Sequence, residues 1–236
     1  MAHAHSQAFV RPYNPSTDLD NTIDVFKGTA DASVQAEPIC TIGSCIWCRP
    51  YLVLEPQSCF VVDDGRGKAV GYIIGTPDTN SFLYRWKPEF IPTFEQDLHG
   101  LPLPVDLSAD DRERLDSKRT SMLDGIYNNP TNLVYEGFGD QLKEYPGHLH
   151  IDILPSHQRL GLGKKLVDTF LDSLRSQGCK AVYLGMVADN AGAARFYERE
   201  GFKRLPYVLD EGISGEQGRT KGHDGGGGTI YYVKDL

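Results

Sequence analysis

The stretch QRLGLGK at residues 158–164 decides the fold class of this chain of 236 residues. An alternating apolar run, Leu149–Leu154, precedes it, and a helical pattern, Lys164–Leu174, follows it. A strand that passes through such a turn into a helix directs backbone N–H groups and the positive end of the helix dipole at one point. Gly161 and Gly163 carry no side chain that would keep a ligand away from the main chain. The turn is therefore predicted to bind a phosphate or pyrophosphate group.

A second strand and helix follow about thirty residues later. Lys180–Val187 is rich in β-branched and apolar residues and predicts a buried strand. Residues 188–190 (Ala-Asp-Asn) supply turn and capping chemistry before a short predicted helix, Ala191–Glu200. Gly201 ends that helix, and another strand begins at Phe202.

The two segments together carry a specific resemblance. The Q-x-x-G-x-G turn, the strand after it and N-x-x-A-x-x-F-Y-E-x-x-G-F resemble the acetyl-CoA-binding half of the GNAT acetyltransferases, over about residues 145–205. Residues 147–155 (GHLHIDILP) and 51–75 are also similar to bacterial and fungal acetyltransferases related to the C-terminal acetyltransferase-like domain of O-GlcNAcase.

Some of those relatives have kept the fold and lost cofactor binding. This chain keeps Gly161, Gly163, Asn190 and Tyr197, which favours a working site. It departs from many members of the superfamily at Arg159, where they have a glycine, and this residue bears on the detailed geometry of the turn.

The resemblance implies acetyl-CoA as the co-substrate, direct transfer to a primary amine, and no metal. Tyr197 matches the superfamily tyrosine that protonates the departing sulfur, and Asn190 would cap its helix or contact the pantetheine arm. The expected cofactor-binding residues are Ile153, Leu154, Gln158, Arg159, Leu160, Gly161, Leu162, Gly163, Lys164, Asn190, Ala193 and Tyr197.

The strand before the turn has a polar row. Because side chains alternate along a strand, His148, His150 and Asp152 point to one face and the intervening apolar residues to the other. Asp152, with or without His150, is the candidate base for the amine proton, and a backbone N–H of residues 151–154 is the candidate donor to the thioester carbonyl. Pairing within the core and a zinc site of H-x-H-x-D spacing are the alternatives.

The whole pattern predicts an α/β fold, a GNAT-like mixed central sheet flanked by helices. We expect one domain over residues 1–236, with a cofactor-binding core at 145–205 and an insertion at 77–146 before the cofactor-binding strand. Residues 30–57 are less regular. Predicted strands cover 8–13, 58–63, 68–76, 149–154, 180–187, a stretch from 202, and 229–234, and further helices cover 19–29 and 108–127.

The insertion is rich in aromatic residues. Tyr84 and Trp86 are candidates to stack on a sugar ring, and with Asp152 beside them they would suit an amino sugar such as glucosamine; packing in the core is the alternative. The glycine-rich segment 210–228 predicts a linker between two strands, with a lid over the acceptor as the alternative.

Charge and composition limit the partners. A net charge of −8 and the absence of a basic stripe argue against nucleic acid, and no apolar run is long enough to span a membrane. Without a signal-peptide pattern we expect a cytoplasmic protein with reduced thiols. Cys40, Cys45 and Cys48 have metal-like spacing but apolar neighbours, so burial is favoured over zinc.

Three functions compete. The first is an N-acetyltransferase for a small amine, with an amino sugar preferred. The second is an acetyltransferase for a protein lysine or N-terminus, and the third is a non-catalytic module of the same fold. A homodimer is expected from the habits of the superfamily alone.

Overall fold

The computed structural model describes residues 8–94, 98, 101–135, 139–209 and 228–236. Most of the glycine-rich segment, 210–227, lies outside the described residues, so neither the linker nor the lid interpretation of it is tested. Within the described ranges, every helix is too short or too polar to cross a lipid bilayer.

The predicted fold class is confirmed. The described strands form one seven-stranded sheet in the order β1-β2-β3-β4-β5-β7-β6, in which only β4 and β5 are parallel neighbours. The strands are β1 (Phe9–Pro12), β2 (Phe60–Asp63), β3 (Ala69–Thr76), β4 (Gly147–Ile153), β5 (Ala181–Val187), β6 (Lys203–Leu209) and β7 (Thr229–Asp235).

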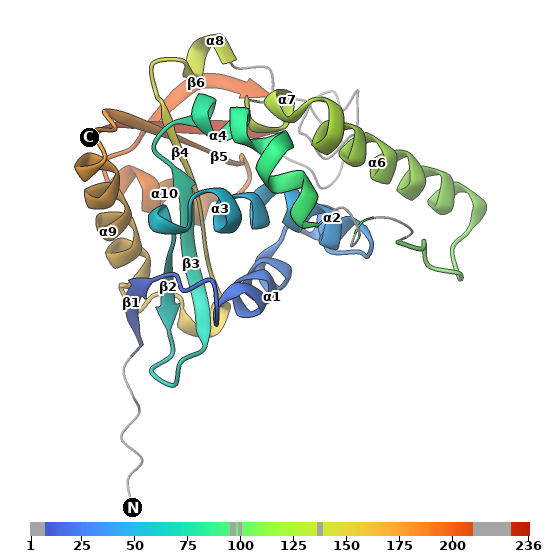
Figure 1. Cartoon of the computed structure of the whole chain (residues 1–236), viewed down its shortest axis with the longest axis horizontal. Helices are drawn as coiled ribbons and strands as arrows, with labels where there is room; N and C mark the ends of the chain where they lie inside the picture. The colour runs from blue at the N-terminus through green and yellow to red at the C-terminus, as the bar shows by residue number, and fades with distance from the viewer. Residues whose placement is uncertain (1–7, 95–97, 99–100, 136–138, 210–227) are drawn as a thin grey trace, which may run out of the picture.

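Helices cover both faces of this sheet (Figure 1). The α-helices are α1 (Leu19–Thr29), α2 (Ile39–Trp47), α3 (Arg49–Leu54), α4 (Thr79–Arg85), α6 (Ala109–Asn128), α7 (Pro130–Tyr135), α8 (Gly139–Leu142), α9 (Leu162–Ser176) and α10 (Ala191–Arg199). The short helices are η1 (Ala32–Val34), η2 (Pro56–Ser58), η3 (Trp86–Phe90), η4 (Ile91–Thr93) and η5 (Pro155–His157).

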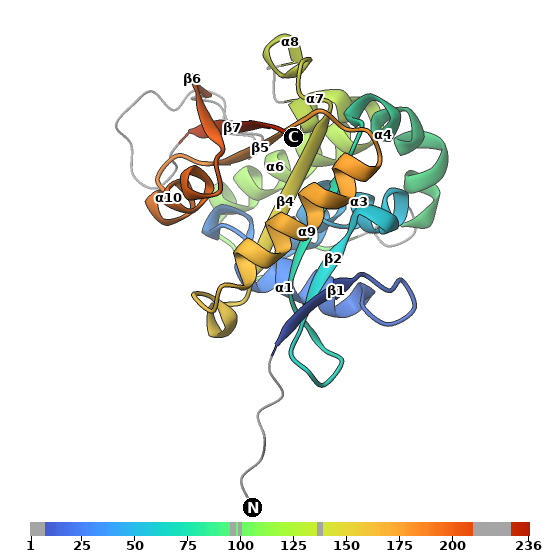
Figure 2. The same cartoon turned by 90° about the vertical axis from the view of Figure 1, so that its left-hand side faces the viewer.

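The two faces have separate apolar cores. On one face α9 lies across β4, as Figure 2 shows, and its buried residues pack against the apolar side chains of β2, β3 and β4. On the other face α1, α2, α3 and α6 enclose a second core with side chains of β2 and β3. The period-two alternation of β4 sends Leu149, Ile151 and Ile153 to the α9 side, as predicted.

The less regular segment 30–57 contains the helices α2 and α3 and the short helices η1 and η2. Most residues of α2 are buried, and periodicity alone does not distinguish such a short apolar run from a strand. Cys40, Cys45 and Cys48 are buried thiols of this helix and its end. No group of three His, Cys, Asp or Glu side chains among the described residues is placed to hold a metal ion.

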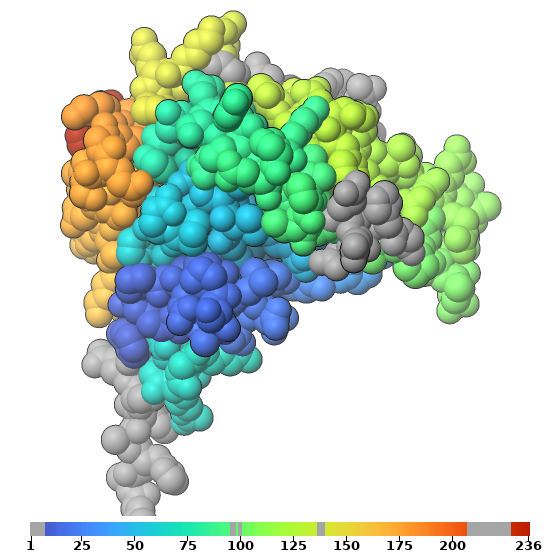
Figure 3. Space-filling view, viewed as in Figure 1, coloured from blue at the N-terminus to red at the C-terminus, as the bar shows by residue number. Residues whose placement is uncertain are grey.

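The insertion builds a layer of helices outside α2 and α3. α6 is largely exposed and buries only Met122 and Ile126. Figure 3 shows its N-terminal part standing out at the edge of the molecule. The aromatic side chains of α4, η3 and η4 instead stack on one another in the core beneath it.

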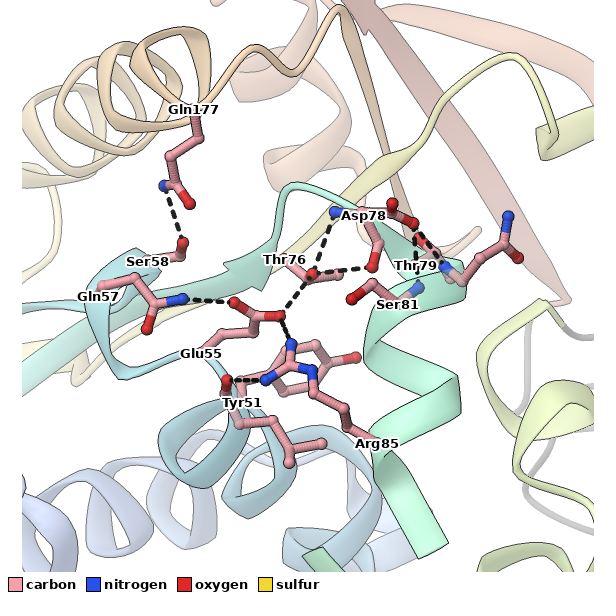
Figure 4. Close-up of polar contacts among 12 residues, drawn as sticks. Tyr51, Glu55, Gln57, Ser58, Thr76, Asp78, Thr79, Ser81, Arg85 and Gln177 are labelled. Carbon is pink, nitrogen blue, oxygen red and sulfur yellow. Dashed lines mark hydrogen bonds and ion pairs between the residues drawn. The ribbon is translucent and has the colours of Figure 1, made fainter. Parts of the chain in front are cut away.

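A buried ion pair ties α3 to α4 (Figure 4). The Glu55 carboxylate lies at the end of α3, is 3% exposed, and pairs with the Arg85 guanidinium, which also donates to the carbonyl of Leu54 at 2.6 Å. The amide of Gln57 donates to the same carboxylate at 2.7 Å, and the Thr76 hydroxyl of β3 lies 3.1 Å from it. Burial raises the pKa of Glu55, and the charge of Arg85 opposes that rise.

We predict that Arg85→Met lowers the free energy of unfolding by about 3 kcal/mol, because it leaves the Glu55 carboxylate buried without its cation. Urea denaturation measures this loss. Arg175→Met is the matched control, since Arg175 pairs with Asp172 on the surface and such pairs contribute less than about 1 kcal/mol. Equal losses in the two variants would contradict the prediction.

Candidate functional site

The site begins where β4 and β5 separate. The two strands pair only at Gly147–Val182 and His148–Tyr183, and beyond these pairs no ladder joins them in the described structure. A Cβ on Gly147 would lie 2.9 Å from Val182, so glycine permits the close approach at the apex. The separation opens a wedge between the facing edges of two central strands.

Backbone groups of β4 point into this wedge. The N–H of Leu154 donates to the carbonyl of Val70 on the β3 side at 3.0 Å. Because N–H groups of an antiparallel strand alternate in direction, those of Ile151 and Ile153 point to the β5 side. Of the candidate donors, Ile151 and Ile153 therefore direct their N–H groups into the wedge, and Leu154 does not.

The turn after β4 has the geometry expected of an anion site. Gly161 caps α9 with φ of 75°, and a Cβ there would meet nothing within 4 Å, so the glycine is required by the backbone angle alone. The first helical bond runs from the N–H of Lys165 to Gly161, which leaves the N–H groups of residues 162–164 without an intrahelical acceptor. These groups and the helix dipole can hold a phosphate.

Arg159 also adopts a left-handed backbone, with φ of 61°. Many superfamily members have glycine at this position. The turn keeps the left-handed conformation although the residue is arginine, and this conformation costs a non-glycine residue about 1 kcal/mol. The Arg159 side chain is exposed, as are Gln158 and Leu160. Gln158 donates its side-chain amide to the carbonyl of Ile153 at 2.8 Å.

Gly163 also has a packing role. A Cβ at this position would lie 3.3 Å from the Phe196 ring, so the glycine allows α9 and α10 to pack closely. Close approach of a ligand to the main chain at Gly161 and Gly163 stays a prediction. The ammonium group of Lys164 sits 3.0 Å from Asp168 and 3.5 Å from Glu200.

α10 begins with the predicted cap. The Asn190 side chain accepts the N–H of Ala193 at 3.0 Å, which satisfies one donor of the first turn. Tyr197 on the next turn is 7% exposed and packs among Phe196, Phe202 and Tyr232.

The Tyr197 hydroxyl is directed toward β4. Burial and the nearby charge of Asp152 raise the pKa of Tyr197, and Tyr72 on β3 interacts with it in turn. A phenol with a raised pKa remains protonated near neutral pH and can donate a proton into the wedge.

The polar row of β4 faces the side opposite α9, as predicted. Asp152 pairs across the sheet with Tyr72, whose hydroxyl donates to the carboxylate at 2.5 Å. His148 and His150 both lie against Tyr51 of α3, whose hydroxyl is 2.7 Å from Nε2 of His148 and 3.0 Å from Nε2 of His150. The rings of Tyr51 and His150 meet edge to face with centroids 5.0 Å apart.

Burial shifts the pKa of each group in the row. It raises the pKa of Asp152 to about 6, against the opposing hydrogen bond from Tyr72, and lowers the pKa of His150 to about 4. Burial, with some help from His150, also lowers the pKa of His148. At neutral pH both imidazoles are uncharged, and Asp152 is an anion that has lost part of its hydration.

A cavity of about 890 Å³ opens in front of this row. β4 and β5 form its floor, and α1, α2, α6 and β7 contribute to its walls. The side chains that give it its chemistry are Trp47, Tyr51, His150, Asp152, Tyr183 and Tyr231. The cavity thus combines several aromatic rings with the half-buried carboxylate of Asp152, and charged side chains such as Asp111, Arg114 and Lys118 also line it.

The two predicted sugar-stacking residues lie outside this cavity. Trp86 is fully buried, donates its indole N–H to the carbonyl of Ile126 at 3.1 Å, and packs between Phe82 and Phe90, so it has no face for a substrate. Tyr84 is 84% exposed on the outer side of α4 and is not among the lining residues. The prediction for Trp86 is wrong because aromatic content alone does not separate core from site.

Three functional neighbours were missed in the sequence. Tyr72 follows from the register of β3 against β4, which places it opposite Asp152. Tyr51 and Thr79 reach the row from helices far away in the chain, and no local pattern marks them.

Comparisons with known proteins agree with this geometry. Residues 128–202 match the model of the acetyltransferase (GNAT) family. A stretch of 67 residues is 42% identical to the mycothiol acetyltransferase of Geodermatophilus obscurus, covering 28% of this chain and 22% of that protein. The chain therefore spans about a fifth of the length of this curated relative.

Solved structures show the same fold over the whole chain. The crystal structure of SsHAT matches 97% of this chain and 98% of its own, with 29% identity and a TM-score of 0.67. A polyamine N-acetyltransferase of Drosophila melanogaster matches 98% of this chain and 100% of its own, with 16% identity and a TM-score of 0.53. YncA of Salmonella typhimurium, described as a putative acetyltransferase with its cofactor acetyl-CoA, matches 97% and 94% of the two chains, with 13% identity and a TM-score of 0.52.

The raised pKa of Asp152 predicts how stability depends on pH. The folded pKa of about 6 lies above the ordinary value of 3.8, so the folded state binds more protons in this window and loses stability as pH rises from about 4 to 6. Asp152→Asn removes this loss. Relative to wild type, the variant should gain about 3 kcal/mol of unfolding free energy between pH 4 and pH 8.

Urea denaturation at the two pH values measures the gain, and Asp172→Asn on the exposed face of α9 is the control. A stability difference between Asp152→Asn and wild type that is the same at pH 4 and pH 8 would show that the carboxylate is not destabilised by burial.

Proposed function

Because the chain carries a GNAT acetyltransferase domain, we propose that it transfers an acetyl group from acetyl-CoA directly to the primary amine of a small acceptor. One observation carries the proposal: the strands β4 and β5 separate into a wedge, the glycine-capped N-terminus of α9 follows β4, and a cavity with several aromatic rings and the half-buried Asp152 carboxylate lies beside them. A thioester in the wedge would lie between that N-terminus and the cavity.

The residues present fit acetyl-CoA. The N–H groups of residues 162–164 would hold its pyrophosphate, with Gly161 leaving open space beside them. Asn190 and Ala193 lie at the start of α10, beside the path of the pantetheine arm from this turn into the wedge. The bound thioester supplies an electrophilic carbonyl carbon and a thiolate leaving group. Its chemistry calls for no metal.

Asp152 and His150 bind the amine and accept its proton. The half-buried Asp152 carboxylate on the floor attracts the cationic form of the acceptor into the cavity. A neutral amine is needed for attack, and the uncharged His150 and the Asp152 carboxylate are the two proton acceptors within the row. Ile153 N–H donates to the thioester oxygen as negative charge develops there.

Tyr197 completes the proton transfer. The side chain is buried, and burial together with the charge of Asp152 raises the pKa of its hydroxyl, which keeps it protonated. It donates a proton to the sulfur as the carbon–sulfur bond breaks. In total the amine nitrogen loses one proton and the sulfur gains one.

The acceptor is proposed from the cavity. Several aromatic rings beside the Asp152 carboxylate suit a small amine with a flat or apolar body, and an amino sugar such as glucosamine satisfies this description. The similarity of residues 51–75 and 147–155 to relatives of the O-GlcNAcase C-terminal domain supports the same class. Because a polyamine acetyltransferase and a mycothiol acetyltransferase are among the similar proteins, other amines should also be tested as acceptors.

The experiment is an acetyl-transfer assay with glucosamine, polyamines, arylalkylamines and lysine peptides, combined with calorimetry of acetyl-CoA binding. Turnover of small amines supports the proposal. Turnover of lysine peptides alone would make the protein a protein acetyltransferase. Failure to bind acetyl-CoA at millimolar concentration would make it a non-catalytic module. The proposed reaction needs no nucleic acid or membrane, and a cytoplasmic homodimer remains part of the proposal.

We predict that Tyr197→Phe lowers kcat about 100-fold and leaves acetyl-CoA affinity nearly unchanged, because it removes the proton donor and keeps the ring. Tyr232→Phe is the matched control: Tyr232 packs beside Tyr197, with ring centroids 5.9 Å apart, but its hydroxyl donates to Glu198. Steady-state kinetics and calorimetry separate the two effects. An unchanged rate in Tyr197→Phe would assign the acid to another group.

A further inference from the structure

Four polar groups on the cavity side of β4 form a continuous hydrogen-bonded chain. It runs from the carbonyl of Pro146 through Thr79, His148 and Tyr51 to His150. The successive separations are 2.8, 2.8, 2.7 and 3.0 Å, each within hydrogen-bond range. Tyr51 and His148 are almost fully buried, so water does not substitute for a missing partner.

The first link sets the direction of the chain. A carbonyl oxygen only accepts, so the Thr79 hydroxyl donates its single proton to Pro146. Its oxygen must then accept from Nδ1–H of His148, since a neutral imidazole carries one N–H. Nε2 of His148 is left as an acceptor.

The remaining links follow from this direction. Tyr51 donates its hydroxyl proton to Nε2 of His148 and can then only accept from His150. His150 therefore carries its proton on Nε2, and its Nδ1 bears a lone pair. Among the described residues, Nδ1 of His150 has no hydrogen-bond partner. The atom is not one of the buried polar atoms without a partner, so it is open to the cavity that the ring lines.

The opposite direction makes fewer bonds. If Thr79 donated to His148 instead, the chain would run outward to His150 with three links, because the Thr79 proton would no longer reach Pro146. The direction that ends on a carbonyl makes all four links. The Pro146 carbonyl also accepts the backbone N–H of Thr79 at 2.7 Å, so it keeps a partner in either direction. The four-link direction adds one hydrogen bond among buried groups, and that additional bond favours it.

We propose that this chain fixes His150 as the Nε2–H tautomer and makes its Nδ1 the acceptor of the amine proton. Tyr51, His148 and Thr79 are positioning residues, and Asp152 binds the ammonium form of the acceptor. This deepens the proposed function and rests on it. The ammonium first gives one proton to the Asp152 carboxylate. The neutral amine nitrogen then forms a bond to the acetyl carbon as the carbon–sulfur bond breaks, its second proton passes to Nδ1, and the sulfur leaves with a proton from Tyr197.

The tautomers are read directly by NMR of the full chain labelled with ¹⁵N. Two-bond ¹H–¹⁵N correlation spectra near pH 7, with signals assigned from His148→Asn and His150→Asn, should show Nδ1–H for His148 and Nε2–H for His150. A wild-type spectrum with Nδ1–H at His150 overturns the proposal. Neither result depends on turnover, so the proposal and the acetyltransferase assignment can fail separately.

Thr79→Val tests the direction of the hydrogen-bonded chain at the end far from His150. Without the Thr79 oxygen, His148 gains by moving its proton to Nε2 and donating to Tyr51, which then donates to His150. The proposal expects His150 to switch to Nδ1–H and kcat to fall at least about tenfold, although Thr79 is three hydrogen bonds away from His150. An unchanged His150 tautomer in this variant overturns it.

Tyr51→Phe removes both central links and should leave His150 as a mixture of tautomers, with kcat lowered about tenfold and KM little changed. Tyr13→Phe is the matched control, because Tyr13 is a buried tyrosine of the same core that does not line the cavity. A single Nε2–H tautomer of His150 in Tyr51→Phe would show that the chain does not fix the ring, even if the Thr79 variant fails to fold.

Discussion

The separation of β4 from β5 after His148 and Tyr183 is the constraint on which the rest of the site depends. Two central strands that stop pairing leave backbone donors and acceptors without ladder partners in the middle of a sheet, where such groups are normally all satisfied. A fold tolerates this only if something else occupies the gap. The wedge therefore indicates a ligand with polar groups of its own, and a thioester with its pantetheine amides is such a ligand.

The alternation of side chains along β4 divides the work between the two faces of the sheet. Leu149, Ile151 and Ile153 are held by α9, whose N-terminus supplies the anion site, so the apolar half of the strand anchors the cofactor side. The polar half faces the cavity. Because the period is two, one strand can serve the core and the site at the same time, and a shift of register by one residue would exchange them.

Local patterns predicted the sheet, the glycine turn before α9 and the polar row because each depends on neighbours in sequence. The turn from Leu154 to Gly161 and the cap at Asn190 follow from residue types that their backbone angles and hydrogen bonds require. The helix α2 was not predicted, since periodicity alone does not distinguish a short, mostly buried apolar run from a strand. Trp86 failed for a related reason: only packing distinguishes an aromatic ring in the core from one in a binding site.

Three tyrosines lie around the polar strand β4, and two of them, Tyr51 and Tyr72, were not predicted from the sequence. Tyr51, Tyr72 and Tyr197 approach β4 from α3, β3 and α10, three elements that are distant in the chain. A tyrosine can bury its ring in an apolar core and still place a hydroxyl at a polar group, so it satisfies buried histidine and carboxylate side chains without a mobile loop.

The hydroxyls of these tyrosines also explain why the row can remain polar. Each buried imidazole or carboxylate would otherwise weaken the fold, and the raised pKa of Asp152 shows that the penalty is only partly offset. A carboxylate that were fully stabilised by its neighbours would hold a cationic amine less strongly and accept a proton less readily. The residual destabilisation is thus concentrated on the Asp152 carboxylate of the cavity floor, where a bound amine would relieve it.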